Sequence, residues 1–190
     1  MLVNFLNKYR EYLLFFSIIL IYEGLCYYFI VLRAPRWGDE VHFHPTVISF
    51  SQGITLEKIR TYNELITPLT FLVYGVWGKL VGTELHNLRI LSILSGAATH
   101  LSLFAYLKKY FRGKLLWGLI LIWLLNPCVI GFNVVVFTDV ISNLLIILFL
   151  IFFTERRYIQ VALVTSLMLY TRQYNLVLIV AAALRQLYIR

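Results

Sequence analysis

The first long apolar run, Tyr12–Leu32, constrains the fold of this 190-residue chain more than any other feature. One acid, Glu23, interrupts it, and its length matches the ~20 residues that a helix needs to cross the ~30 Å hydrocarbon core of a bilayer. Inside lipid the backbone must satisfy its own hydrogen bonds, so a spanning segment is a helix or part of a closed barrel. No strand-like alternation is sustained, and we therefore predict an all-α, polytopic membrane protein.

The composition agrees with this class, since 61% of the residues are hydrophobic and only 14% are charged. We expect one membrane domain over residues 1–190, with about six spans and with interfacial or re-entrant helices on the outer face. The spans are expected at 12–32, 88–107, 115–137 and 140–154, followed by a broken pair of short spans at 158–184. Residues 33–87 form the expected outer loop with short helices.

The distribution of basic residues predicts the orientation. The net charge is +8, but the basic residues form short clusters between apolar runs, which argues against nucleic acid as a partner. The positive-inside rule assigns such clusters to the cytoplasm. If residues 65–82, which contain Pro68, Gly75 and Gly78, dip into the membrane without crossing it, four basic clusters fall on one side. We therefore predict a cytoplasmic start, with membrane lipids as neighbours.

This topology places the unusual polar residues together at the outer face. They are Asp39, Glu40, His42 and His44 in the first outer region, Arg89 at the start of the second span, Thr138 and Asp139 at the next outer turn, and Arg172, Gln173 and Asn175 at the last. We expect them to converge on one outer-leaflet cavity.

Several of these residues have both a structural and a functional interpretation. Asp39 suits a helix cap or a general base. Asp139 suits a turn or a second acid, because an aspartate in mid-membrane would cost ~2.5–3.5 kcal/mol. Arg172 suits an interfacial side chain or a phosphate ligand, with Gln173 and Asn175 as neighbouring amides.

A metal site is not predicted. Asp39, Glu40, His42 and His44 are zinc-competent side chains, but no remote cysteine or histidine completes a tetrahedral site. The two histidines are instead expected to be interfacial or substrate hydrogen-bonding groups. The two cysteines, Cys26 and Cys128, lie in expected spans and imply no disulfide framework. We predict no metal and no cofactor.

Four stretches resemble a known family. They are "DEVHFHPTVISFSQG" from Asp39, "YNELITPLTFLVY" from Tyr62, "FNVVVFTDVIS" from Phe132 and "YTRQYNLVLIV" from Tyr170. In this order they resemble the GT-C superfamily of membrane glycosyltransferases. The nearest resemblance is to the dolichyl-phosphate-glucose α-1,2-glucosyltransferase family of N-glycosylation. Hydropathy alone does not require Thr-Asp-x-x-Ser or Arg-Gln-x-Asn, so the last two stretches are the more specific.

The resemblance implies transfer of a hexosyl group, glucosyl in that family, from a polyprenyl or dolichyl phosphate to a glycan or lipid-linked oligosaccharide acceptor. The transfer would invert the anomeric carbon and need no divalent ion. Asp39 would be the base, with Glu40 as the second candidate. Asp139, with Thr138, His42 and His44, would position the acceptor. Arg172, Gln173, Asn175 and Arg89 would bind the donor phosphate. The site would face the endoplasmic-reticulum lumen, or the periplasm if the membrane is bacterial.

The resemblance also leaves alternatives open. It covers only the amino-terminal part of such an enzyme, so the chain is expected to be incomplete relative to that family. The main alternative is a non-catalytic truncated relative or an assembly subunit in the membrane. A small transporter is a weaker alternative, because its polar site would lie near the bilayer midplane rather than at one face.

Overall fold

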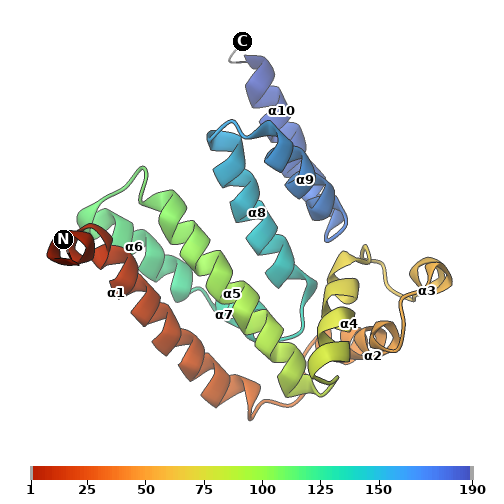
Figure 1. Cartoon of the computed structure of the whole chain (residues 1–190). Coiled ribbons are helices and arrows are strands. Elements are labelled where there is room, and N and C mark those ends of the chain that lie inside the picture. The colour runs from red at the N-terminus through yellow and green to blue at the C-terminus, as the bar shows by residue number, and fades with distance from the viewer. Residues whose placement is uncertain (1, 189–190) are drawn as a thin grey trace.

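The computed structural model describes residues 2–188, and every regular element in this part of the chain is helical (Figure 1). The elements are α1 (Leu2–Cys26), η1 (Tyr27–Val31), α2 (Glu40–Ser51), α3 (Leu56–Thr61), α4 (Leu69–Val81), α5 (Leu85–Leu107), α6 (Gly113–Leu124), α7 (Pro127–Val134), α8 (Thr138–Thr154), α9 (Tyr158–Leu169), η2 (Gln173–Asn175) and α10 (Leu176–Tyr188). The all-α prediction is confirmed for the described residues.

Fewer helices than expected are long enough to span a bilayer. Two described segments, Tyr9–Val31 and Leu85–Leu107, have the necessary length and apolar composition. A third is added if α6 and α7, which meet at 59°, are counted as one span. The chain is thus a helical membrane protein, but the prediction of about six spans is not confirmed. The helices α4, α8 and α9 are apolar but have only 10–17 residues each.

The bend between α6 and α7 has a local cause. Pro127 occupies the first turn of α7 and has no N–H to continue the hydrogen bonding of α6. The Asn126 side chain instead accepts a hydrogen bond from the Cys128 N–H (2.9 Å) and starts a new helix. The expected straight span over 115–137 is therefore broken near its middle.

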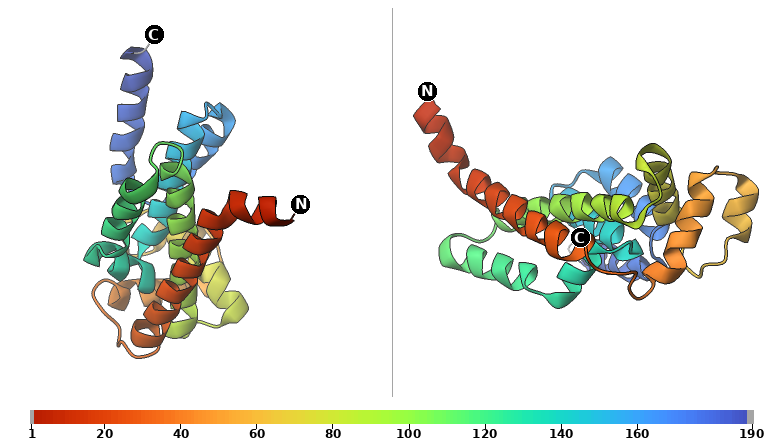
Figure 2. Two further views of the ribbon diagram at one scale, coloured as in Figure 1. Left: turned by 90° about the vertical axis from the view of Figure 1, so that its left-hand side faces the viewer. Right: turned by 90° about the horizontal axis from the view of Figure 1, so that it is seen from below.

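Helix α5 is central and packs against α1, α7 and α8 (Figures 1 and 2). One apolar core joins α1, α5 and α6, where the Phe15 and Phe104 rings stack with centroids 4.2 Å apart. A second core includes Phe43 and Phe50 of α2 and Phe71 of α4. The pair α2–α4 and the short helix α3 thus form a lobe at the end of α1 that is remote from the N-terminus (Figure 2). We call residues 33–82 the outer lobe.

Basic side chains gather at the opposite end. Lys108 pairs with Glu11 of α1 (Nζ–Oε2 2.7 Å), and both Lys109 and Arg157 pair with Glu155 at the end of α8. These pairs connect the start of α1 with the ends of α5 and α8, towards the upper left in Figure 1. We call this side the inner end, since it carries the clusters that the positive-inside rule assigns to the cytoplasm.

Candidate functional site

A fully buried ion pair connects the outer lobe to α5. Arg89, near the start of α5, donates from Nη2 to Oε2 of Glu40 (2.6 Å) and from Nε to Oε1 (3.0 Å). The side chains are 1% and 0% exposed, respectively. The guanidinium also donates to the carbonyl oxygens of Val31 (3.3 Å), Ala34 (2.8 Å) and Pro35 (2.8 Å). Arg89 therefore connects α5 to α2 and to the end of the first span.

The carboxylate of Glu40 has further donors. Its Oε1 accepts from the Val136 N–H (2.9 Å) and its Oε2 from the Trp37 N–H (3.3 Å). A buried charge is tolerated only when it is paired and hydrogen-bonded, and Glu40 meets both conditions. Glu40 is thus not free to act as a base, and Arg89 is not free to bind a phosphate. The geometry corrects both expected roles.

The other residues of the "DEVHFH" stretch point in different directions. Asp39 precedes α2 but makes no side-chain cap hydrogen bond, and it is exposed. His42 is exposed as well. His44 is buried and its Nε2 lies 2.7 Å from the Thr83 carbonyl oxygen, which connects α2 to the turn after α4. The stretch therefore does not form one site.

A second polar cluster joins α8 to the turn before α10. Asp139 lies in the first turn of α8, where the helix dipole favours a negative charge. Its carboxylate pairs with Arg172 and accepts a hydrogen bond from the Tyr174 hydroxyl (2.8 Å). Nearby, Asn175 donates to the Ser142 hydroxyl (2.9 Å). The structure thus brings together the two sequence segments that contain Asp139 and Arg172.

Two predicted residues lie at the margin of this cluster. Gln173 is exposed and donates to the Leu65 carbonyl oxygen (3.3 Å) of the outer lobe. Thr138 is buried, and its hydroxyl oxygen has no hydrogen-bond partner among the described residues. The Val135–Thr138 segment connects this cluster to Glu40, because the Val136 N–H binds Glu40. The two clusters are thus linked through the backbone.

The Tyr174 hydroxyl provides a test of this cluster. The residue is 55% exposed, and partial burial of its hydroxyl, followed by the hydrogen bond and charge of Asp139, raises its pKa to about 12. Asp139→Asn is expected to lower this pKa while leaving it above the usual value of ~10, because the burial remains. The raised pKa contributes a small stabilisation below pH ~10, because solvent screens this exposed residue, and the contribution is lost as the pH rises towards 12. Ultraviolet titration, with Tyr174→Phe to identify the signal, measures the shift; an unchanged value in Asp139→Asn would contradict the contact.

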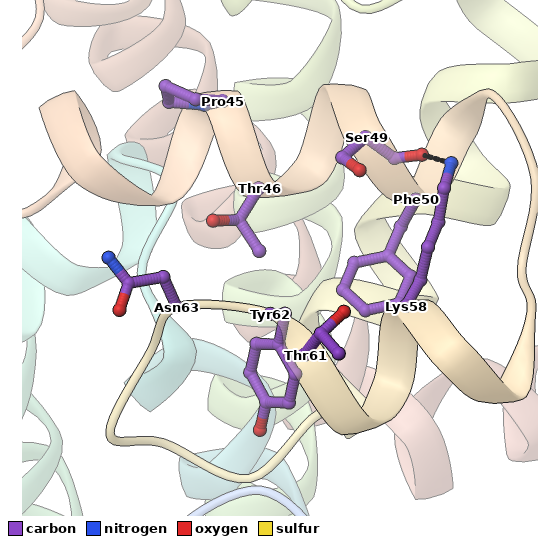
Figure 3. A pocket seen from close by; sticks show the side chains of 8 residues that line it. All are labelled: Pro45, Thr46, Ser49, Phe50, Lys58, Thr61, Tyr62 and Asn63. Carbon is purple, nitrogen blue, oxygen red and sulfur yellow. Dashed lines mark hydrogen bonds between the residues drawn. The ribbon is translucent and has the colours of Figure 1, made fainter.

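The outer face also has a hollow, but other residues line it. A cavity of about 280 Å³ lies between α2 and α3, and its lining consists of Pro45, Thr46, Ser49, Phe50, Lys58, Thr61, Tyr62 and Asn63 (Figure 3). The Lys58 ammonium donates to the Ser49 carbonyl oxygen (2.7 Å) across it. None of the predicted site residues lines this hollow, so it is not the expected common cavity.

A polar cluster that we did not predict lies between the apolar helices. The Trp123 Nε1–H donates to Nδ1 of His100 (2.9 Å), and the Asn133 amide lies 2.8 Å from Nε2 of the same ring. Glu23 Oε1 is 3.4 Å from this Nε2, and neither Glu23 oxygen has a hydrogen bond among the described residues. The sequence did contain a signal for this cluster, because Glu23 and His100 each lie in a predicted span. Ionisable side chains inside a membrane usually pair with one another.

No metal centre is apparent in the part of the chain that the structure describes. No group of three or more histidine, cysteine, aspartate or glutamate side chains there is positioned to hold a metal ion. The two cysteines of the sequence are both free, with Cys26 buried and Cys128 exposed.

Comparison with known families assigns the chain differently from the resemblance above. A family model described as "PIG-U: GPI transamidase subunit PIG-U" matches residues 21–188. No curated protein and no solved structure matches the chain significantly. The family match includes both outer clusters and the polar cluster between the apolar helices.

This match overturns the predicted activity. A GPI transamidase subunit is not a hexosyltransferase, so the predicted enzyme is wrong and the expected role of Asp39 as its base falls with it. The expected sugar donor, sugar acceptor and place in N-glycosylation have no support either. The alternative of a non-catalytic assembly subunit in the membrane agrees better with the family.

Proposed function

The chain belongs to the PIG-U family of GPI transamidase subunits, and we propose that it serves as a non-catalytic membrane subunit of such a complex. The observation that carries this proposal is the buried Glu40–Arg89 pair. A carboxylate that is 0% exposed and receives hydrogen bonds from three residues holds the outer lobe against α5. The Glu40 carboxylate therefore has a structural role and is not placed to transfer a proton.

The proposed location is the endoplasmic-reticulum membrane, with the outer lobe in the lumen and the inner end in the cytoplasm. The position of the basic clusters at one end supports this orientation. The outer lobe is also the proposed contact surface for other subunits. This proposal is supported by exposed large apolar side chains that lie outside the long spans. Among them are Leu65 (95% exposed), Trp37 (65%) and Leu56 (62%).

The test is co-purification of the affinity-tagged chain with the other subunits of the transamidase, together with GPI attachment to a reporter protein. We expect Trp37→Ala and Leu65→Ala each to reduce the recovered subunits several-fold, because truncating an anchor residue at the centre of an interface costs ~2 kcal/mol or more. Ile159→Ala is the matched control, since the exposure of Ile159 (77%) lies between those of Trp37 and Leu65 but the residue lies at the inner end.

Two results would contradict the proposal in different ways. If the parent chain recovers no transamidase subunit, the proposed function is wrong. If the parent chain recovers the complex and both outer-lobe variants recover it equally well, the function stands but the contact surface lies elsewhere.

A further inference from the structure

An apolar groove opens at the inner end between α5, α8 and α10. It encloses about 200 Å³, and its lining includes Tyr106, Phe149, Phe153, Leu178, Ala182 and Arg185. A neighbouring cavity of about 250 Å³ shares Phe149, Phe153 and Ala182 and continues towards α9. Side chains of α10 thus take part in two adjoining apolar hollows.

The sequence of α10 explains why the space is left open. Leu178, Ala182 and Arg185 lie on one face of the helix, because they are four and three residues apart. Ala182 packs against the apolar core beside α8, but its single methyl group fills little of the space there. The helix packs against the η2 turn at its start, and its other end stands apart from α9 (Figure 2).

The charge at the inner end favours a negative ligand. Arg185 is exposed, and its guanidinium carbon lies 5.7 Å from the centroid of the Phe153 ring, at the rim of the groove. The nearby acid, Glu155, already pairs with Lys109 and with Arg157 (2.8 Å). No acidic side chain lines the groove. A cation at the mouth of an apolar groove matches a molecule with an anionic head and a hydrocarbon tail.

We propose that this groove binds an anionic phospholipid of the inner leaflet. One acyl chain lies along Phe149, Leu178 and Ala182, and the headgroup phosphate contacts Arg185. A hollow of about 200 Å³ suits a narrow acyl chain better than a whole helix, whose diameter with side chains is ~10–12 Å. Basic residues at the cytoplasmic ends of membrane helices attract anionic lipids. The binding belongs to this chain alone and does not depend on a role in the transamidase, whereas the choice of leaflet rests on the proposed orientation.

The experiment measures lipid binding to the purified full chain in detergent by native mass spectrometry, with phosphatidylserine compared against phosphatidylcholine of the same acyl chains. We expect preferential binding of phosphatidylserine. Arg185→Gln should weaken that preference roughly fivefold, because one basic residue near the surface contributes ~1 kcal/mol of attraction. Ala182→Phe should reduce the binding of both lipids, because it fills the groove, and Ala182→Leu is a milder second variant if the first does not fold.

Two matched controls separate this site from general effects. Arg60→Gln removes an exposed charge from the outer lobe, and Ala162→Phe adds a ring to the exposed side of α9. Both should bind the lipids as the parent chain does.

Four outcomes would overturn the inference. The phosphatidylserine preference could survive in Arg185→Gln, or lipid binding could survive in both Ala182 variants. Water-soluble glycerophosphoserine could also compete as well as the intact lipid, which would identify a phosphate site without a role for the groove. Finally, if the parent chain is a dimer that Ala182→Leu dissociates while lipid binding is unchanged, the groove is a contact between two copies.

Discussion

Arg89→Met is expected to lower the free energy of unfolding by ~3–5 kcal/mol, because it leaves the Glu40 carboxylate buried without its cation. The Arg89 guanidinium makes five hydrogen bonds, two to Glu40 and three to backbone carbonyl oxygens. The substitution removes all of them from a side chain that is 1% exposed. The outer lobe should therefore detach from α5 before the rest of the molecule unfolds.

The measurement is unfolding in mixed detergent micelles, followed by tryptophan fluorescence. Arg36→Met is the matched control, because Arg36 is an exposed arginine in the loop whose carbonyl oxygens Arg89 binds, and its effect should stay within ~0.5 kcal/mol. The double variant Glu40→Met with Arg89→Met should recover part of the loss, since replacing both buried charges by apolar side chains is often close to neutral. If Arg89→Met lowers the free energy of unfolding no more than Arg36→Met does, the structural role of the Glu40–Arg89 pair is refuted.

Gly75→Ala is expected to destabilise the chain by ~1–3 kcal/mol, the usual cost of overpacking. A Cβ atom at Gly75 would lie 2.7 Å from Cβ of Phe50 and 3.1 Å from the Phe50 backbone carbon. Because the next contacts are backbone atoms of Phe50 and Ser51, which cannot rotate away, α2 would have to shift away from α4. The added methyl group opposes the gain of ~0.5–1 kcal/mol that alanine normally brings to a helix.

The control for this substitution is Gly118→Ala in α6, where no atom lies within 4 Å of the added Cβ. The two changes are chemically identical, yet Gly118→Ala should leave stability unchanged or raise it by up to ~1 kcal/mol. The same unfolding assay should show changes of opposite sign in the free energy of unfolding for the two variants. Equal effects at both positions would mean that α2 and α4 are not in close contact.

The outer polar residues illustrate why the activity was misjudged. An acid and an arginine at a helix mouth suit catalysis, phosphate binding or a buried ion pair equally well, and residue type alone does not separate these roles. Glu40 and Arg89 are 49 positions apart, and only their packing reveals that each is the partner of the other. Asp139 and Arg172, 33 positions apart, were both expected at the outer face, but not as a pair.

The helical class and the membrane environment could be predicted from contiguous stretches of the sequence. An apolar run such as Tyr12–Leu32 must hydrogen-bond its own backbone, and that requirement depends on contiguous residues alone. The break at Pro127 was equally local in cause, because proline lacks the N–H that the preceding helix needs. The pairing of side chains depends instead on how helices pack, which places Glu23 beside His100 and opens the groove beside Ala182. Distances across the bundle are set by all the packed side chains together, and no single segment contains that information.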